Sequence, residues 1–280
     1  MSKLTTPKPS SSPLGKQSLT AYINGIGLIG PGLIDWPSSQ AMLIDNTAYQ
    51  LQPTIIPQPT LLPAAERRRS GALVKLTLAA GLEATTAADM EAALLPCVYT
   101  SSSGDGQNCH EISLALASDD RQISPTRFHN SVHNAAAGYW SIATGAMTPI
   151  SVLCAFDAGF GAGLLEALTQ ALVDDVATLL IACDTPYPEP LHHVRPISDA
   201  FGVAMVLAPT AHQNSLAKIT VSLTSEAAQT LDHLALEHLR LGVPAARSLP
   251  LLMAIAQGQP ARVILDYFDH LRIAVEVTPC

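Results

Sequence analysis

The chain has 280 residues, of which 48 % are hydrophobic and only 14 % are charged. This length and apolar content exclude an intrinsically disordered chain and a small protein held together by disulfides. The 15 lysines and arginines stand against 23 aspartates and glutamates, a net charge of −8, which argues against nucleic-acid binding. The low share of charged residues suggests that part of the surface faces another protein.

The cysteines and the lengths of the apolar runs indicate in which cellular compartment the protein is expected. The chain has 5 cysteines, an odd number, without a CxxC pair, so neither a disulfide framework nor a zinc site is expected. No run approaches the roughly 20 apolar residues that cross a bilayer, and membrane insertion is not expected. We predict a cytoplasmic protein with a flexible tail at residues 1–18 and a single domain at residues 19–280.

In the first half of the chain, strands, helices and irregular segments alternate. The apolar runs Ala21–Leu28 and Pro96–Ser101 predict strands, and Ile-Gly-Pro-Gly at 29–32 predicts a turn. Residues 37–65 are rich in proline and predict an irregular surface segment, and residues 102–109 predict a polar loop. Alanine-rich Ser70–Ala93 predicts a helix, and Ser124-Pro125 predicts the start of a helix that continues to about Thr144.

The second half begins with a strand, a tight turn and a helix. Ile150–Cys154 predicts the strand and residues 160–173 the helix, whose buried face carries Phe160, Leu164, Leu168 and Ala171. Further apolar runs predict strands at residues 178–183, 203–207, 218–223, 262–265 and 272–277. Strands that alternate with helices predict an α/β layered fold with a mixed sheet.

Several polar clusters have a structural and a functional interpretation. His129 and His133 lie four residues apart and would share one face of a helix, but no third metal ligand accompanies them, so we expect no metal site. His192 and His193 lie between prolines, as in an exposed loop. The three arginines 67–69 are typical of a solvated helix start, and they could also steer an acidic carrier protein.

Cys154 lies near the point where a strand gives way to a helix. Free backbone amides and the helix dipole at such a point lower the pKa of a thiol and can stabilise an oxyanion. Buried cysteines in strands are more often small apolar residues. No GxGxxG loop follows a predicted strand, and the sequence has no GxxxxGK[ST], HExxH or GxSxG motif, so no cofactor is expected.

Four segments together resemble the beta-ketoacyl synthases of the thiolase superfamily. They are AYINGIGLIGPG (21–32), SPTRFHNSVHNAAAGYWSIATGAMTPIS (124–151), TLLIACDTP (178–186) and HVRPISDAFGVAMVLAP (193–209). The resemblance covers roughly residues 20–225 and implies a thiolase-like fold, mainly the N-terminal half of a ketosynthase.

Two departures from the active enzymes affect the implied function. Counting back along the helix from Ala167 and Gly163 places the nucleophile position at Asp157, whereas counting forward from Gly145 places it at Cys154. A carboxylate is a poor acyl acceptor, because the anhydride that it forms would hydrolyse. The histidine motif HGTGT and the GFGG segment of the family's second half do not occur in this sequence, so we expect no catalysis by this chain alone.

Inactive chains of this kind are chain-length factors, and WSIATGAM and GFGAGLLEAL resemble the truncated variety of aryl polyene pathways. The resemblance implies a heterodimer with a catalytic ketosynthase that extends chains on acyl carrier protein. Five residues are then candidates for the product tunnel or the subunit interface: Phe128, His129, Val132, His133 and Phe160. Two alternatives stay open, an acyl transferase or thioesterase that uses Cys154 with His129 or His133, and a purely structural partner of the ketosynthase.

Overall fold

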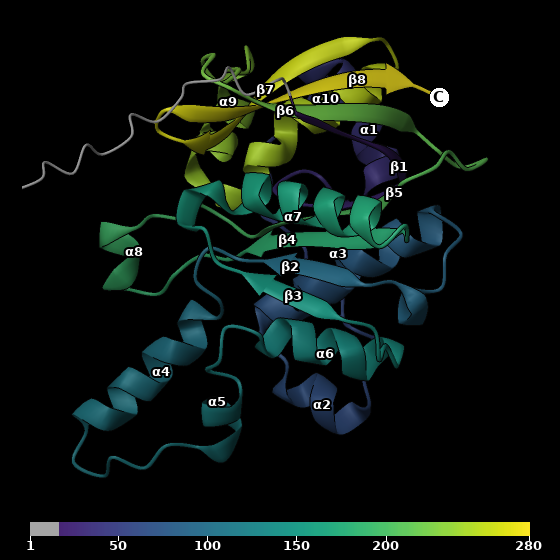
Figure 1. Ribbon diagram of the computed structural model, residues 1–280. Coiled ribbons are helices and arrows are strands. Elements are labelled where there is room, and N and C mark those ends of the chain that lie inside the picture. The colour runs from purple at the N-terminus through teal and green to yellow at the C-terminus, as the bar shows by residue number, and fades with distance from the viewer. Residues whose placement is uncertain (1–16) are drawn as a thin grey trace, which may run out of the picture.

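The computed structural model describes residues 17–280, which fold around one mixed β-sheet (Figure 1). The 8-stranded sheet has the order β3-β2-β4-β5-β1-β6-β8-β7. Its strands are β1 (Ser18–Ile29), β2 (Cys97–Thr100), β3 (Ile150–Leu153), β4 (Thr178–Asp184), β5 (Phe201–Ala208), β6 (Ala217–Thr224), β7 (Ala261–Phe268) and β8 (Leu271–Pro279). Strands β3, β2 and β4 are parallel and the other pairs are antiparallel. The mixed α/β sheet and every predicted strand are confirmed.

Helices cover both faces of the sheet. They are α1 (Trp36–Ile44), α2 (Ala64–Arg69), α3 (Ala72–Ala87), α4 (Gly106–Ala117), α5 (Pro125–His129), α6 (Ala135–Thr144), α7 (Gly159–Val173), α8 (Leu191–Val194), α9 (Leu234–Gly242) and α10 (Leu249–Gln257). One hydrophobic core lies between the sheet and α3 and α6. A second core contains side chains of α1, α7, α9 and α10, so the sheet is enclosed between two helical layers.

Helix α3 packs unusually close to the central strand β1. A Cβ atom at Gly25 would lie 2.2 Å from the Ala84 carbonyl oxygen, and one at Gly27 would lie 2.0 Å from the Ala80 carbonyl oxygen. Glycine alone leaves room for this approach. Gly25 and Gly27 of β1 therefore serve helix packing.

Helix α7 is the predicted amphipathic helix, and its buried face is confirmed. Phe160, Leu164 and Leu168 are at most 1 % exposed and belong to one core. The β7–β8 hairpin packs against the first turn of α7, because a Cβ at Gly161 would lie 3.0 Å from the side chain of Ile273. Figure 1 shows α7 lying between β4 and the β6–β8 part of the sheet.

Two helices were missed in segments predicted to be irregular. Within residues 37–65, α1 begins after Asp35, whose carboxylate accepts a hydrogen bond from the Ser38 amide at 2.7 Å. Within residues 102–109, α4 begins after Asp105, which accepts from the Asn108 amide at 3.0 Å. Aspartate is a strong N-cap residue, so both starts carried a signal that the proline and glycine content concealed.

The single helix predicted from Ser124 to Thr144 is wrong, because the chain forms α5 and α6 with a turn between them. The Ser131 hydroxyl donates to the Phe128 carbonyl at 2.8 Å, and the Asn130 side chain donates to the Arg69 carbonyl at 3.1 Å. Serine and asparagine side chains that bond the backbone in this way compete with helix hydrogen bonds. The expected shared helical face of His129 and His133 is therefore absent.

Three smaller predictions need correction. Arg67–Arg69 form the last turn of α2 rather than a helix start, and His192 and His193 lie in the one-turn helix α8 rather than in a loop. The tail predicted for residues 1–18 is too long, since Ser18 already belongs to β1, and residues 1–16 lie outside the described residues. No helix of residues 17–280 is both long and apolar enough to cross a membrane.

Candidate functional site

The parallel strands β2, β3 and β4 have their carboxyl ends on the same side of the sheet, and polar residues lie at these ends. Ser101 and Ser102 follow β2, Cys154 follows β3, and Asp184 ends β4. Ligand sites of α/β sheets form outside the carboxyl ends of such strands. The carboxyl ends of these three strands are therefore the first candidate site.

Cys154 is an exposed residue. Its thiol donates to the Ser102 carbonyl oxygen at 3.1 Å, and His133 Nε2 lies 3.1 Å from the Ser101 carbonyl oxygen. No hydrogen bond joins Cys154 to a histidine within residues 17–280. The structure thus does not assemble the dyad of Cys154 with His129 or His133 that one alternative requires.

Asp157 lies in the turn between β3 and α7, which we call the elbow (residues 155–158). Its carboxylate accepts a hydrogen bond from Arg195 Nη2 at 2.8 Å and lies 3.4 Å from Arg247 Nη2. The Arg195 guanidinium also stacks over the Phe156 ring, 3.6 Å from its centroid. Both oxygens of Asp157 are ion-paired, so its role in the structure is to hold the two arginines.

A cavity of about 670 Å³ opens near these strand ends on the side of α2 and α4, and a second of about 640 Å³ opens at the elbow. Phe156 and Arg247 line the elbow cavity on one side, and Tyr267, Phe268 and His270 of the β7–β8 hairpin line the other. The hairpin belongs to the residues after 225, which form β7 and β8 with α9 and α10. These added elements therefore close over the start of α7.

Asp184 is the most deeply buried acid at these strand ends, at 3 % exposure. Its carboxylate accepts hydrogen bonds from the Ser102 amide at 2.7 Å and the Ala245 amide at 2.9 Å. Burial raises the pKa of Asp184, and these hydrogen bonds oppose the rise. Asp184 thereby joins the loop after β2 to the segment before α10, which is a structural role.

An apolar groove of about 510 Å³ runs along α5 and α6, and we call it the α5–α6 groove. It brings together three of the five predicted tunnel or interface residues, namely Phe128, His129 and Val132. Phe128 and Val132 are 68 % and 53 % exposed, and Ile142 of α6 joins them at 51 %. These apolar side chains have no covering element among the described residues.

The other two predicted residues lie elsewhere. His133 contacts the Ser101 carbonyl, and Phe160 of α7 is 1 % exposed in the core. The tunnel and interface roles of the five residues stay predictions, but the structure gathers only Phe128, His129 and Val132 on one surface. Sequence reasoning missed Ile142 and also Met147, which is 95 % exposed between α6 and β3.

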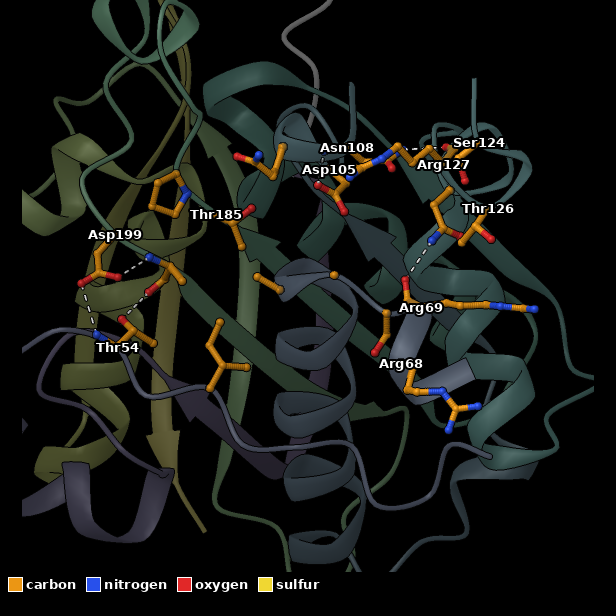
Figure 2. Close-up of a pocket in the computed structure, with 18 residues that line it drawn as sticks. Thr54, Arg68, Arg69, Asp105, Asn108, Ser124, Thr126, Arg127, Thr185 and Asp199 are labelled. Carbon is orange, nitrogen blue, oxygen red and sulfur yellow. Dashed lines mark hydrogen bonds between the residues drawn. The ribbon is translucent and has the colours of Figure 1, made fainter. Parts of the chain in front are cut away.

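The 670 Å³ cavity is polar and carries cationic side chains. Figure 2 shows Thr54 and Asp199 on one side and Arg68, Arg69 and Arg127 on the other. Asp199 accepts a hydrogen bond from the Thr54 amide at 3.2 Å. Two of the arginines are ion-paired, Arg69 with Glu66 at 3.3 Å and Arg127 with Glu111 at 3.6 Å. Arg68 forms no ion pair within the described part of the chain.

A metal centre is not formed by the described residues, since no group of three histidine, cysteine, aspartate or glutamate side chains gathers within residues 17–280. Sequence reasoning also missed Phe156, Arg195 and Arg247. Phe156 closely follows β3, whereas Arg195 and Arg247 lie far from the carboxyl end of any strand and carried no local signal. The elbow brings the three together across 91 positions of chain, from 156 to 247.

Comparisons with known proteins give the family and the fold. A search of curated proteins found no match. Among solved structures, a chain of the ketosynthase ApeO in complex with its chain length factor ApeC from Xenorhabdus doucetiae superposes with a TM-score of 0.71 at 23% identity, over 92% of this chain and 99% of that chain. A chain of the ishigamide ketosynthase/chain length factor has a TM-score of 0.68 at 15% identity, over 93% and 99%.

A third structure is the type II acyl-carrier protein AntF with the ketosynthase AntDE bound to the hexaketide, with a TM-score of 0.70 at 10% identity, over 94% of this chain and 100% of that chain. These likenesses establish a thiolase-like ketosynthase fold. The family model for the beta-ketoacyl synthase N-terminal domain matches residues 35–243, and the chain therefore belongs to the beta-ketoacyl synthase family.

Proposed function

We propose that this chain is a non-catalytic chain-length factor of the cytoplasm. It forms a heterodimer with a catalytic beta-ketoacyl synthase and shapes the channel into which an aryl polyene or other polyketide or fatty chain grows on acyl carrier protein. The chain itself supplies no nucleophile and no cofactor. Its contribution is the surface that completes the partner.

The observation that carries this proposal is the free edge at β3. Strand β3 pairs with β2 on one side, and no second strand of the described chain pairs with it. Four exposed apolar side chains come from α5, α6 and the segments that flank α6, namely Phe128, Val132, Ile142 and Met147, and Met147 lies three residues before β3. We call the β3 edge together with these four side chains the docking face.

An exposed sheet edge beside apolar side chains is a surface that proteins either protect or pair. Strand β3 (ISVL) contains no charged residue that would oppose pairing with another chain. Figure 1 places α6 and α5 on the same flank of the molecule as β3, so one partner could cover them together. The small share of charged residues in the chain, 14 %, agrees with a large apolar interface.

The proposed absence of catalysis rests on the elbow and on Cys154. Asp157 is held by two arginines, and Cys154 donates to a backbone carbonyl rather than to an imidazole. Acyl transfer needs a thiolate and a base within hydrogen-bond reach. The similar structures whose descriptions name a chain length factor beside its ketosynthase support the same assignment.

The proposed length-setting role is steric. Phe128 and Val132 line an uncharged groove, and Gly138 on its floor has open space where a Cβ would stand. A partner that covers the groove would turn it into a channel of fixed length. An additional two-carbon unit that must push into a packed wall costs on the order of 1–3 kcal/mol, which suffices to stop elongation.

The carrier protein could approach the polar cavity through Arg68, Arg69 and Arg127. These guanidinium groups come from α2 and α5, and α5 also carries Phe128 of the docking face. An acidic carrier would be attracted to them over about a Debye length. The proposed assembly thus has a basic entrance next to an apolar channel.

Co-expression with candidate ketosynthases tests the proposal. We expect a one-to-one complex by native mass spectrometry and condensation activity that needs both chains, with none from this chain alone. Enlarging Gly138 to Leu in the complex should shorten the products, whereas unchanged product lengths in an intact complex would leave only the structural role. A monomer that binds no ketosynthase, or turnover of malonyl thioesters by the isolated chain, would overturn the proposal.

A further inference from the structure

The elbow contains an unusual backbone conformation. Phe156 has φ of +51°, and the other non-glycine residues with positive φ in the described chain are Asp89, Arg121 and Asp175. The left-handed region suits glycine, asparagine and aspartate, whereas a bulky aromatic residue there is a strained outlier. Such strain persists only where the surroundings hold it, and it concentrates at functional sites.

The surroundings of Phe156 supply this restraint. Arg195 stacks on the ring at 3.6 Å and donates to Asp157 at 2.8 Å, so one guanidinium holds both residues. Arg247 approaches the second oxygen of Asp157 at 3.4 Å. The side chains of Arg195 and Arg247 are 20% and 18% exposed, whereas that of Asp157 is 39% exposed. The two arginines are thus held mostly inside the protein, and their shared carboxylate is in partial contact with water.

The direction of the Phe156 side chain matters for chemistry. A strained turn between a strand and a helix lifts its side chain above the end of the sheet, which is how nucleophiles are presented in α/β hydrolases. Phe156 is 59% exposed and borders the 640 Å³ elbow cavity. It lies three residues before the first residue of α7, so the free amides of that helix are close.

Neither of the positions that the sequence suggested has these properties. Asp157 has its carboxylate in two ion pairs, and Cys154 follows β3 directly with its thiol on the Ser102 carbonyl. Only Phe156 combines the left-handed backbone, the exposed side chain and the cavity.

We propose that the backbone site of Phe156 is the vacated nucleophile position of this chain, and that the phenyl ring, held by Arg195 and Asp157, plugs it. The inference rests on the proposed non-catalytic function and deepens it, because it states what prevents acylation. The site has lost its nucleophile through one side chain, while the geometry that would present a thiol is retained.

Chains with a single accessible thiol test this inference. The first carries Phe156→Cys with Cys109→Ser, Cys154→Ala and Cys280→Ser, and the matched control carries only Cys109→Ser and Cys280→Ser, which keeps Cys154. The remaining Cys97 and Cys183 are buried. Each chain is treated with the acetyl thioester of N-acetylcysteamine and followed by intact mass.

In the acylation step the thiolate attacks the thioester carbonyl carbon. The carbonyl carbon–sulfur bond to N-acetylcysteamine breaks, and the leaving thiolate takes a proton from water. We expect the Phe156→Cys chain to gain one acetyl group at pH 7 about tenfold faster than the control, because a neighbouring arginine and a helix N-terminus lower the pKa of a thiol. Adding Arg195→Met should remove most of that advantage.

Equal rates in the two chains, or a Phe156→Cys chain indifferent to Arg195→Met, would overturn the inference. A Phe156→Cys chain that fails to fold would also count against it, since the inference holds that the ion pairs of Asp157 fix the backbone without the ring. Phe156→Gly, which relieves the strain at positive φ, is the folding control. None of these outcomes depends on a ketosynthase, so failure here leaves the heterodimer proposal standing.

Discussion

The two edge strands of the sheet, β7 and β3, differ in how the chain protects them from pairing with another chain. At β7, the Gln229 amide, in the segment between β6 and α9, donates to the Ile264 carbonyl at 2.9 Å, and Arg262 forms ion pairs with Glu226 and Glu276. At β3 the chain offers only apolar residues and one serine, with Met147 beside them at 95 % exposure. Charges and covering loops are the usual protection against edge pairing.

The difference between the edges supports β3 as the edge that binds the partner in the proposed heterodimer. The β7 edge is protected within the chain, so it needs no second protein. Strand β3 is partly buried, but it has no charged residue, and no second strand among the described residues pairs with it. An unpaired strand edge of this kind invites pairing with another chain. We therefore assign the heterodimer contact to β3, and each prediction below tests one side of this contrast.

Substitutions at the protected β7 edge should destabilise the folded chain. Arg240 of α9, 3 % exposed, pairs with Glu237 and with Asp266 of β7. Removing one partner of a buried ion pair costs about 3–5 kcal/mol, because it leaves uncompensated charge. We expect Arg240→Met to lower the free energy of unfolding in urea by about 3 kcal/mol. A loss below about 1 kcal/mol would show that β7 is not anchored by this cluster.

Substitutions on the docking face at the free β3 edge should weaken binding to the ketosynthase rather than destabilise the fold. We expect Ile142→Asp with Met147→Asp to weaken the ketosynthase complex by at least about 100-fold, which is about 2.7 kcal/mol, because charges would be buried in an apolar interface. The measurement is Kd by calorimetry, with the unfolding temperature of the isolated chain as a check on folding.

Leu234→Asp is the matched control for that double variant. Leu234 is 75% exposed on α9, next to the protected edge. Its replacement should leave Kd unchanged. Equal weakening by both changes would mean that the partner does not select the docking face.

A change of pH should alter the stability of the packing at the centre of the sheet and leave the docking face unchanged. Glu83 of α3 accepts hydrogen bonds from the Leu28 amide at 2.9 Å and the Trp36 amide at 2.5 Å. Burial raises its pKa from 4.5 to about 7. The folded chain therefore binds more protons than the unfolded chain between these values, and its stability falls as pH rises from 4.5 to 7.

The expected loss over this range is on the order of 1–3 kcal/mol, since part of Glu83 is in contact with water. Glu83→Gln does not titrate and should flatten the profile. Unfolding in urea at half-unit steps of pH measures the slope for both chains. A profile as steep in the variant as in the unchanged chain would assign the pH dependence to another group.

The fold was largely predictable from the sequence because its strands are apolar runs. All four residues of β2, all seven of β4 and all eight of β5 are buried, and a continuous apolar run is the pattern of such strands. The turn at Asn130 and Ser131 was not predictable, because it depends on a hydrogen bond from Asn130 to Arg69 on another element. The periodicity of α5 and α6 alone continues across that turn.

The candidate site was predictable only in those parts whose residues are close together in the sequence. Phe128 and Val132 are close in sequence and reach the same groove. The elbow was not predictable, since Arg195 and Arg247 reach Asp157 from distant segments. Counting along the sequence gave Asp157 and Cys154 as nucleophile positions. The backbone angle that distinguishes Phe156 between them is a property of the folded turn.

The smallest expected effect concerns the basic side chains next to the docking face. Arg68→Glu with Arg69→Glu should weaken association of an acidic carrier protein with the heterodimer by about tenfold at low salt, because exposed charges contribute at most about 1 kcal/mol each. The effect should shrink above about 0.15 M salt, where the Debye length is about 8 Å. Lys218→Glu on β6 changes the net charge in the same direction at an exposed position and serves as the control. If Lys218→Glu weakens the carrier complex as much per charge as the arginine change, net charge rather than this basic entrance attracts the carrier.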